Sequence, residues 1–177
     1  MGDGCLIEVT KSYRGYKNYV TAFYNSNLDL MENFKKLFLE VFGVKGNYYP
    51  DTRKEKKITY AFRSYSKEAF DKISSLGFPI GLKKFKLRVP EVIWKSNRQE
   101  KLLFLKGLTI TDGSIKKGGQ IVFHMASKLF LEDISDLIYE LFNLRKPIKE
   151  YLQRGKYFSY QLLLNKKQAQ EVLNSQL

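Results

Sequence analysis

The stretch Phe104–Ser114, FLKGLTITDGS, combines leucines at helical spacing with an acidic side chain, Asp112, directly before a glycine. The opening of the chain, Gly2-Asp3-Gly4, repeats this ending. Gly113 can adopt the left-handed conformation that ends many helices, and the negative end of a helix dipole favours cations. Asp3 and Asp112, if brought together, would form a divalent metal site. Either Asp-Gly pair taken alone is equally a common turn dipeptide.

The chain contains a diverged internal repeat. Residues 31–44 align without a gap on residues 131–144, an offset of 131 − 31 = 100, and both segments have the apolar spacing of amphipathic helices. Residues 66–73 align on residues 166–173 at the same offset. Two collinear helices and two acidic turns predict two pseudo-symmetric halves.

Each half also contains two pairs of short strands with turn residues between them. Along residues 120–126, Ile121, Phe123 and Met125 alternate with Gln120, Val122 and His124, so one face of the sheet is expected to pack on helices while the other is left to polar and basic groups. The predicted fold is therefore α+β, with an antiparallel sheet and packing helices in each half. The predicted strands are residues 5–11, 18–25, 46–52 and 57–64 in the first half and 114–117, 120–126, 148–153 and 157–164 in the second.

The predicted domains are residues 1–76 and 97–177, joined by a proline-containing connecting segment at residues 77–96. Asn97 has a side chain suited to capping a helix that reaches Thr111. The second half therefore contains a complete helix before its acidic turn, and no part of the sequence is of low complexity.

The composition indicates a basic, intracellular protein. There are 31 Lys and Arg against 18 Asp and Glu, and the net charge of +13 favours polyanions such as nucleic acid, with a solvated basic surface as the alternative. The lone Cys5 and the lone His124 exclude an internal disulfide and a zinc ligand set, so oxygen ligands would hold any metal, which suits Mg²⁺. No apolar run approaches the ~18 residues of a membrane span, and the start lacks the features of a signal peptide. We therefore expect a soluble protein of the cytoplasm or an organelle matrix, without a membrane partner.

With its repeat, its acidic turns and the passage from Arg88–Glu91 to Phe104–Gly107, the chain resembles the single-chain LAGLIDADG homing endonucleases. The resemblance extends over nearly the whole length. Residues Leu105–Gly113 match the family motif at its first leucine, its glycine, its second leucine and its closing Asp-Gly. The resemblance implies two halves of this type, each with a saddle-shaped antiparallel sheet.

The resemblance also implies a function. Two motif helices in this family pack side by side, here through Leu105, Gly107 and Leu108, and bring their closing aspartates together beneath the DNA minor groove. Asp3 and Asp112 would then be the catalytic residues and the ligands of Mg²⁺, which activates water and stabilises the leaving oxygen in phosphodiester hydrolysis. The implied activity is sequence-specific cleavage of double-stranded DNA, associated with an intron or an intein.

The chain departs from the family pattern in three places. No helix precedes Asp3, so the helix at residues 97–111 lacks an intrachain partner, and we expect self-association through its apolar face. The sixth motif position, often acidic in the family, is Ile110. The lysine that the family often places before the last helix of each half is absent in register, and Arg63 and Lys166 lie nearby as alternative cations beside the catalytic base.

Polar residues on the predicted sheet faces are the candidate DNA contacts, because base edges are read in the major groove while lysines and arginines hold phosphates. A histidine on a strand is equally an ordinary surface group, and it is not expected to be the catalyst here. The candidates in the first half are Thr10, Arg14, Lys17, Tyr19, Thr21, Arg53, Thr59 and Arg63, and those in the second are Lys116, Lys117, Gln120, His124, Lys149, Tyr151, Gln153, Lys156 and Gln161.

Two other functions stay open from the sequence. A degenerate relative of the endonucleases could act as a DNA-binding module without cleavage, or bind intron RNA as a maturase. A basic RNA-associated structural protein that stacks bases on tyrosine and phenylalanine is the third interpretation. Cleavage of duplex DNA separates the enzyme from the binding module, and a preference for single strands over duplex would favour the RNA-associated protein.

Overall fold

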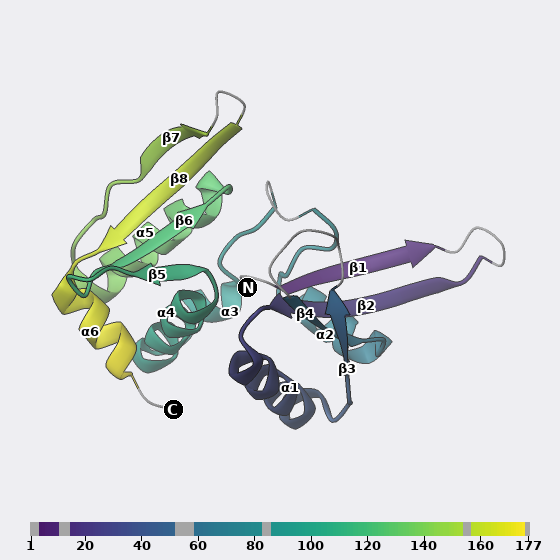
Figure 1. The fold of residues 1–177 in the computed structure, drawn as a ribbon. Helices are drawn as coiled ribbons and strands as arrows, with labels where there is room; N and C mark the ends of the chain where they lie inside the picture. The colour runs from purple at the N-terminus through teal and green to yellow at the C-terminus, as the bar shows by residue number, and fades with distance from the viewer. Residues whose placement is uncertain (1–3, 11–14, 52–58, 83–85, 154–156, 176–177) are drawn as a thin grey trace. The chain divides into compact units, whose positions relative to one another are not determined.

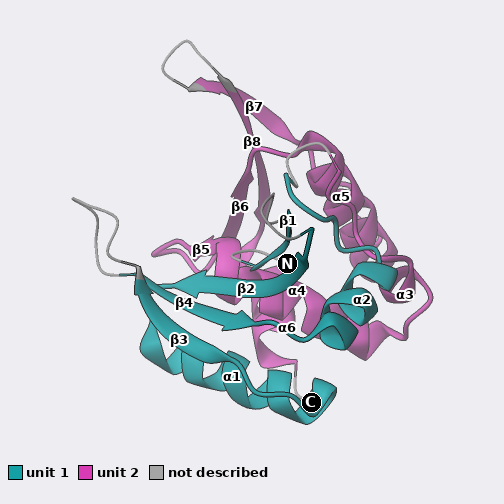
Figure 2. Ribbon diagram, turned by 90° about the vertical axis from the view of Figure 1, so that its right-hand side faces the viewer, with its two compact units in different colours: residues 1, 3–83 teal, residues 2, 84–177 magenta. Residues whose placement is uncertain are grey.

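The computed structural model describes residues 4–10, 15–51, 59–82, 86–153 and 157–175 of the chain (Figure 1). The chain divides into two compact units, drawn in separate colours in Figure 2. Unit 1 comprises Met1 and Asp3–Lys83, and unit 2 comprises Gly2 and Lys84–Leu177. The three-part division expected from the sequence, with a connecting segment at residues 77–96, stays a prediction.

Unit 1 contains a four-stranded antiparallel sheet, here called sheet A, with the strand order β1-β2-β4-β3. Helices α1 and α2 pack on one face of this sheet (Figure 1). The bounds of the elements are β1 Gly4–Thr10, β2 Lys17–Asn25, α1 Leu28–Phe42, β3 Asn47–Asp51, β4 Thr59–Ser64 and α2 Lys67–Ser75.

Unit 2 contains a second four-stranded antiparallel sheet, sheet B, with the equivalent order β5-β6-β8-β7. Its elements are α3 Glu91–Trp94, α4 Arg98–Asp112, β5 Gly113–Ile115, β6 Ile121–Met125, α5 Lys128–Phe142, β7 Lys149–Gln153, β8 Tyr157–Leu164 and α6 Lys166–Asn174. The α+β fold with an antiparallel sheet in each half is thus confirmed. Among the described helices, none has the length and apolar character needed to cross a membrane.

The caps of the helices show how closely the two units repeat. Asn27 accepts a hydrogen bond from the N–H of Leu30 at the start of α1, and α1 ends at Gly43, which has a left-handed φ of 66°. The equivalent caps of α5 are Ser127 and Asn143, so both ends lie 100 residues farther on (127 − 27 and 143 − 43).

The second pair of helices corrects the predicted alignment by one residue. Ser66 caps α2 and Asn165 caps α6, a separation of 165 − 66 = 99 residues rather than 100. At this offset the inward-facing Phe70 of α2 matches the buried Ala169 of α6. Each helix begins at the residue whose side chain makes the N-cap hydrogen bond. The predicted alignment compared side-chain types along the helices, so it did not detect the one-residue shift between the two caps.

The core of unit 1 is aromatic and lies between α1 and sheet A. Phe62 of β4 is fully buried, and Phe38 of α1 lies against it with ring centroids 5.1 Å apart. Phe34 stacks on Phe23 of β2 at 4.3 Å. At the edge of this core the Tyr48 hydroxyl of β3 donates a hydrogen bond to the backbone carbonyl of Met31 at 2.7 Å.

We predict that ionisation of Tyr48 lowers the free energy of unfolding of unit 1 at alkaline pH. Burial, aided by the nearby Glu32, raises the pKa of Tyr48 from 10.0 to about 12. The folded chain therefore holds this proton more tightly than the unfolded chain, so the resulting stability is present below pH 10 and is lost as the pH rises toward 12. In denaturant titrations across this range, the Tyr48→Phe variant should lose less stability than the wild type. Equal losses in both proteins would contradict the prediction.

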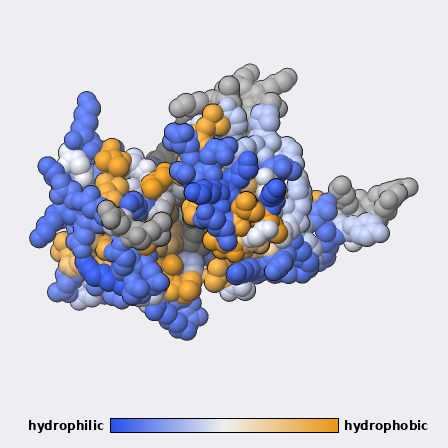
Figure 3. Space-filling model, turned by 90° about the horizontal axis from the view of Figure 1, so that it is seen from below, coloured by the Kyte–Doolittle hydropathy of each residue, from blue (hydrophilic) through white to orange (hydrophobic). Residues whose placement is uncertain are grey.

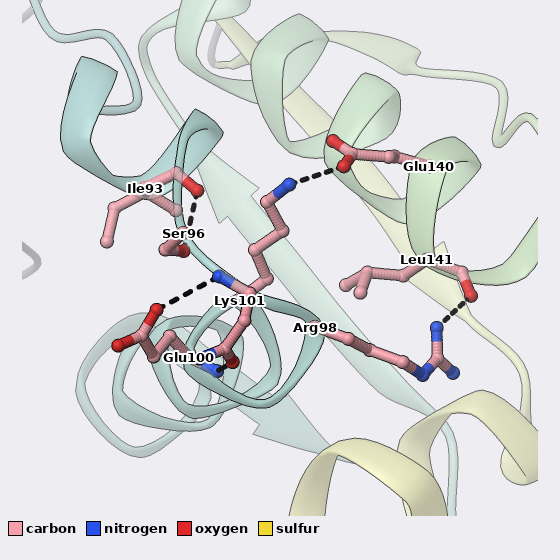
Figure 4. A network of polar contacts seen from close by, with 8 residues as sticks. Ile93, Ser96, Arg98, Glu100, Lys101, Glu140 and Leu141 are labelled. Atoms are coloured by element: carbon pink, nitrogen blue, oxygen red, sulfur yellow. Dashed lines mark hydrogen bonds and ion pairs between the residues drawn. The ribbon is translucent and has the colours of Figure 1, made fainter.

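Polar contacts join the helices of unit 2 (Figure 4). Lys101 of α4, whose side chain is only 7% exposed, forms an ion pair with Glu140 of α5. From the same helix, Arg98 donates to the backbone carbonyl of Leu141 and forms an ion pair with Glu171 of α6. These contacts hold the N-terminal part of α4 against both neighbouring helices.

Candidate nucleic-acid interface and acidic turn

The acidic turn is a direct passage from a helix into a strand. Asp112 is the last residue of α4 and Gly113 is the first of β5. Gly113 has an extended backbone, with φ −81° and ψ 160°, so the predicted left-handed conformation is wrong. Glycine is required for another reason: a Cβ at this position would lie 2.7 Å from the carbonyl oxygen of Thr109 and 2.8 Å from its Cα. The strand can therefore start against the last turn of α4 only if residue 113 has no side chain.

Asp112 is half-buried at the end of α4, where the terminal carbonyls of the helix make the local potential negative. The Thr111 hydroxyl lies 3.4 Å from Asp112 Oδ2 and 3.2 Å from the carbonyl of Gly107. Within the described ranges, no group of three His, Cys, Asp or Glu side chains gathers that could hold a metal. Asp3 lies outside the described residues. The metal site shared by Asp3 and Asp112 therefore stays a prediction, and the structure describes only the position of Asp112.

Helix α4 buries the two leucines that were expected to be free. Leu105 and Leu108 are 0% and 2% exposed, so the prediction that they form an exposed apolar patch is wrong. The helix packs against α3, α5, α6, β5 and β6 within unit 2. Gly107 and Ile110 are exposed instead, and a Cβ on Gly107 would meet no atom within 4 Å. Self-association through Leu105 and Leu108 therefore has no support.

Sheet B has a polar face opposite its helix-packed face. His124 of β6, Gln161 of β8 and Lys149 of β7 are cross-strand partners in register, so their side chains point to the same side. Phe123 and Leu162, one residue along in β6 and β8, are fully buried on the other side. The alternation predicted for residues 120–126 is therefore confirmed at Ile121, Phe123 and His124, whereas Val122 is buried at 3% exposure although it shares the side of His124.

Hydrogen bonds order this face. The Tyr151 hydroxyl donates to Gln161 Oε1 at 2.8 Å, and His124 Nε2 lies 2.9 Å from Ser159 Oγ. The His124 and Tyr151 rings meet edge to face, with centroids 6.3 Å apart. His124, Lys149 and Tyr151 are nevertheless exposed. Sheet B thus presents polar groups that are already oriented and accessible from solvent.

The β5–β6 hairpin adds basic and amide groups to the same face. The N–H of Lys116 donates to the carbonyl of Gln120 at 2.8 Å, which continues the strand pairing beyond Ile115. Strand alternation then places the side chains of Lys116 and Gln120 on the side of His124. Lys117 lies in the turn and is exposed. Of the other candidates, Lys156 and the side chain of Gln153 lie outside the described residues.

In sheet A the strand register separates the candidates. Phe23 pairs with Phe62, and both are buried on the helix side. Alternation along β2 puts Thr21 and Tyr19 on this side as well, where Thr21 is 5% exposed and the Tyr19 ring lies 5.2 Å from that of Phe70 in α2. Contrary to the expectation, Tyr19 and Thr21 therefore do not lie on the open face.

The far end of the β1–β2 hairpin carries two further candidates, Thr10 and Lys17, which pair with each other and are exposed. Lys17 Nζ lies 2.7 Å from Glu8 Oε1, and this hydrogen bond raises the pKa of Lys17. Glu8 thus offsets part of the positive charge that Lys17 brings to the hairpin. Arg14 and Arg53 lie outside the described residues.

Thr59 and Arg63 do lie on the open face of sheet A, together with two tyrosines that the sequence interpretation missed. Tyr24 of β2 and Tyr49 of β3 both pair with Ala61 of β4. The Arg63 guanidinium lies over the Tyr49 ring, 5.3 Å from its centroid. The repeat could have identified both tyrosines, because they lie 124 − 24 = 100 and 149 − 49 = 100 residues before His124 and Lys149.

Arg63 and Lys166 were predicted as cations beside the catalytic base. Lys166 is the first residue of α6 and is exposed, and its aliphatic stem packs along the β5–β6 hairpin, where a Cβ on Gly119 would lie 3.2 Å from its Cγ. Lys67 takes the equivalent place at the start of α2, bound to Asp71 at 2.5 Å. Both units therefore begin their last helix with a lysine, and the catalytic role stays a prediction.

Thr21 yields a stability prediction. Its Oγ1 is buried and has no hydrogen-bond partner within the described part of the chain. Thr21→Val replaces this hydroxyl with a methyl group of similar shape, so the variant should gain about 1 kcal/mol in free energy of unfolding. The matched control is Thr10→Val at an exposed strand position, which should stay within about 0.5 kcal/mol of the wild type. A loss of stability in Thr21→Val, measured by denaturant unfolding, would show that the hydroxyl is satisfied.

The chain thus has two repeated units, each with an antiparallel sheet that helices cover on one face, and unit 2 carries the acidic turn. Residues 99–176 match the family model of the LAGLIDADG-like domain. Unit 2 thus carries a LAGLIDADG-like domain, and the resemblance recognised from Leu105–Gly113 is confirmed. A comparison with curated protein sequences finds no match.

Solved structures share the fold of both units. I-DmoI in complex with DNA and Mn superposes with a TM-score of 0.71 at 19% sequence identity, covering 99% of this chain and 92% of that one. I-WcaI bound to its DNA recognition sequence gives 0.61 at 18% identity, covering 97% and 74%. The N-terminal LAGLIDADG domain of WhiA gives 0.54 at 13% identity, covering 89% and 72%. At these identities the likeness shows that the chain has the LAGLIDADG homing endonuclease fold.

Proposed function

We propose that this chain is a DNA endonuclease of the LAGLIDADG homing type, which recognises a specific double-stranded sequence and hydrolyses its phosphodiester bonds. The observation that carries the proposal is the polar face of sheet B, where hydrogen bonds orient Gln161 and His124 on a side whose residues His124, Lys149 and Tyr151 are exposed. The net charge of +13 supports a polyanionic partner. I-DmoI and I-WcaI, solved with DNA, have the same fold.

The exposed surface of unit 2 provides two kinds of contact. Lys116 and Lys117 are exposed at a hairpin, where flexible cationic side chains suit phosphate oxygens. Gln120 and Gln161 carry amides on the open face, and amides can pair with base edges in the major groove. Figure 3 shows hydrophilic side chains covering much of the face drawn, with apolar patches between them. The proposed interface therefore combines phosphate binding at the hairpin with base recognition along the strands.

The chemistry of the acidic turn fits a hard divalent cation. The Asp112 carboxylate at the C-terminal end of α4 offers the oxygen ligand and negative potential that Mg²⁺ prefers, and Asp3 is the proposed second ligand. A bound Mg²⁺ would supply an activated water and charge stabilisation for hydrolysis. Gly113 keeps the strand against the helix end and so fixes the place of Asp112. A variant of I-DmoI was solved with its target DNA in the presence of Mg.

Salt dependence tests the nucleic-acid interface. Binding of a labelled duplex, followed by fluorescence anisotropy, should weaken linearly in a plot of log affinity against log salt, because each phosphate contact releases counterions. Lys116→Ala should reduce the slope by about 1 if Lys116 binds a phosphate. Gln120→Ala is the matched control: it should leave the slope unchanged and relax the preference at one base pair by ~1–3 kcal/mol. If the duplex affinity of the wild type does not change with salt concentration, the proposal is wrong.

Cleavage separates the endonuclease from the alternative DNA-binding module. Incubation of a duplex library with the full chain and Mg²⁺ should yield cut fragments with a common sequence at their ends. Retention of the duplex without cutting would instead support the binding module. The RNA-binding alternative is not favoured, because I-DmoI and I-WcaI, which share this fold, were solved with DNA.

A further inference from the structure

The open faces of the two sheets contain equivalent rows of side chains. In sheet B, Gln161 pairs with His124 on one side and with Lys149 on the other. In sheet A, Ala61 pairs with Tyr24 and Tyr49 in the same way, and each member lies 100 residues earlier (161 − 61, 124 − 24 and 149 − 49). The strand register thus places chemically different residues at the same position of the two units.

The row in sheet B is rich in hydrogen-bond donors. Because Gln161 Oε1 accepts the Tyr151 hydroxyl at 2.8 Å, the amide is oriented and its Nε2 carries two N–H donors. Lys149, directly across from Gln161, adds an ammonium group with three donors and is exposed. Side chains of directly paired residues lie close enough to contact one base together. Gln161 and Lys149 together therefore present hydrogen-bond donors, which suit a base edge that carries acceptors.

Guanine is the base that fits this pair. In the major groove guanine offers two acceptors, N7 and O6, whereas adenine and cytosine present an amino donor, and thymine a single acceptor beside a methyl group. A donor pair would meet the adenine or cytosine amino group unfavourably and would leave a donor unmatched against thymine.

The row in sheet A has a different character. Ala61 is 1% exposed and has no polar side-chain atom, and half-buried tyrosines lie on both sides of it. The Tyr49 ring is covered by the Arg63 guanidinium. The centre of this row therefore has nothing with which to pair a base edge.

We infer that Gln161 and Lys149 are specificity-determining residues that read a guanine, whereas the equivalent row Tyr24–Ala61–Tyr49 reads no base by hydrogen bonding. The inference rests on the proposed DNA-binding function and adds to it the base that this part of unit 2 selects. It also implies that the segments of DNA read by the two units differ at the equivalent base pair.

Selection from a random duplex library tests the inference. The wild type should enrich a sequence that contains a guanine whose replacement by another base weakens binding about tenfold or more. In the double variant Gln161→Leu/Lys149→Met, the preference at this one position should fall below about threefold while the other positions keep theirs. The matched control, Lys167→Met/Gln170→Leu, makes the same changes at exposed positions of α6 and should retain the guanine.

Further outcomes separate the inference from the proposed function. Substituting 7-deazaguanine, which lacks the N7 acceptor, should weaken binding by the wild type but not by the double variant. Tyr24→Phe and Tyr49→Phe should leave every base preference unchanged. The inference would be overturned if the double variant keeps the guanine preference, or if it loses a preference for a base other than guanine. It would also be overturned if Tyr24→Phe or Tyr49→Phe relaxes any base preference. Failure of the wild type to bind duplex DNA would instead refute the proposed function itself.

Discussion

Replacing Asp112 by Asn should reduce Mg²⁺-dependent cleavage of duplex DNA by about 100-fold or more, while binding of the duplex stays unchanged or becomes tighter. A catalytic metal contributes several kcal/mol to the transition state, and about 1.4 kcal/mol corresponds to a factor of ten in rate. The amide of Asn is a weaker ligand for Mg²⁺ than a carboxylate, and it removes a negative charge that repels phosphate. Single-turnover cleavage and duplex binding, measured on the same preparations, separate the two effects.

The control is Asp136→Asn, which removes an exposed carboxylate from α5, distant in sequence from the acidic turn. It should cleave like the wild type. A thermal melt of both variants checks that Asp112→Asn still folds, because Asp112 lies in the last turn of α4, directly before the tightly packed Gly113. Full cleavage by a folded Asp112→Asn protein would show that Asp112 is a turn residue without a role in hydrolysis.

Replacing Asp133 by Ala should lower the free energy of unfolding by about 2–3 kcal/mol. Asp133 of α5 is 5% exposed, and its carboxylate accepts hydrogen bonds from Arg88 Nε at 2.7 Å, from Arg88 Nη2 at 2.6 Å and from the backbone N–H of Val89 at 2.9 Å. Arg88 is 58% exposed and can return to water, so the loss stays below that of a fully buried ion pair. The Val89 N–H, by contrast, would be left buried without its acceptor.

Urea unfolding of Asp133→Ala, Asp136→Ala and Arg88→Ala measures these terms separately. Asp136 lies on the same helix with an exposed side chain, so its replacement should change stability by less than about 0.5 kcal/mol. Arg88→Ala should cost less than Asp133→Ala, because Asp133 would keep its hydrogen bond to Val89. If Arg88→Ala and Asp133→Ala lower the free energy of unfolding equally, the hydrogen bond from the Val89 backbone to Asp133 contributes little.

Local signals in the sequence identified the five longer helices, but not α3 at Glu91–Trp94, and the polar side of sheet B around His124. Asn97 caps α4 as predicted, with a reciprocal hydrogen bond between its backbone N–H and Glu100, and both partners lie within four residues of each other. Ile121, Phe123 and His124 follow the alternation expected for β6, whereas Val122, on the side of His124, is buried at 3% exposure. The contact between Arg88 and Asp133 had no such signal, because its partners lie 45 residues apart.

By itself, the sequence determined the two repeated halves, the start of α4 at its Asn97 cap, the basic charge and the acidic turn, because caps and apolar spacing act within one or two helical turns of the chain. Only the tertiary structure decided the rest. The faces of β2 depend on Phe23 pairing with Phe62, which places Thr21 inward although its residue type suits either face. The buried side of α4, with Leu105 inward and Gly107 exposed, likewise depends on helices and strands that are distant in sequence, and no local pattern encodes those partners.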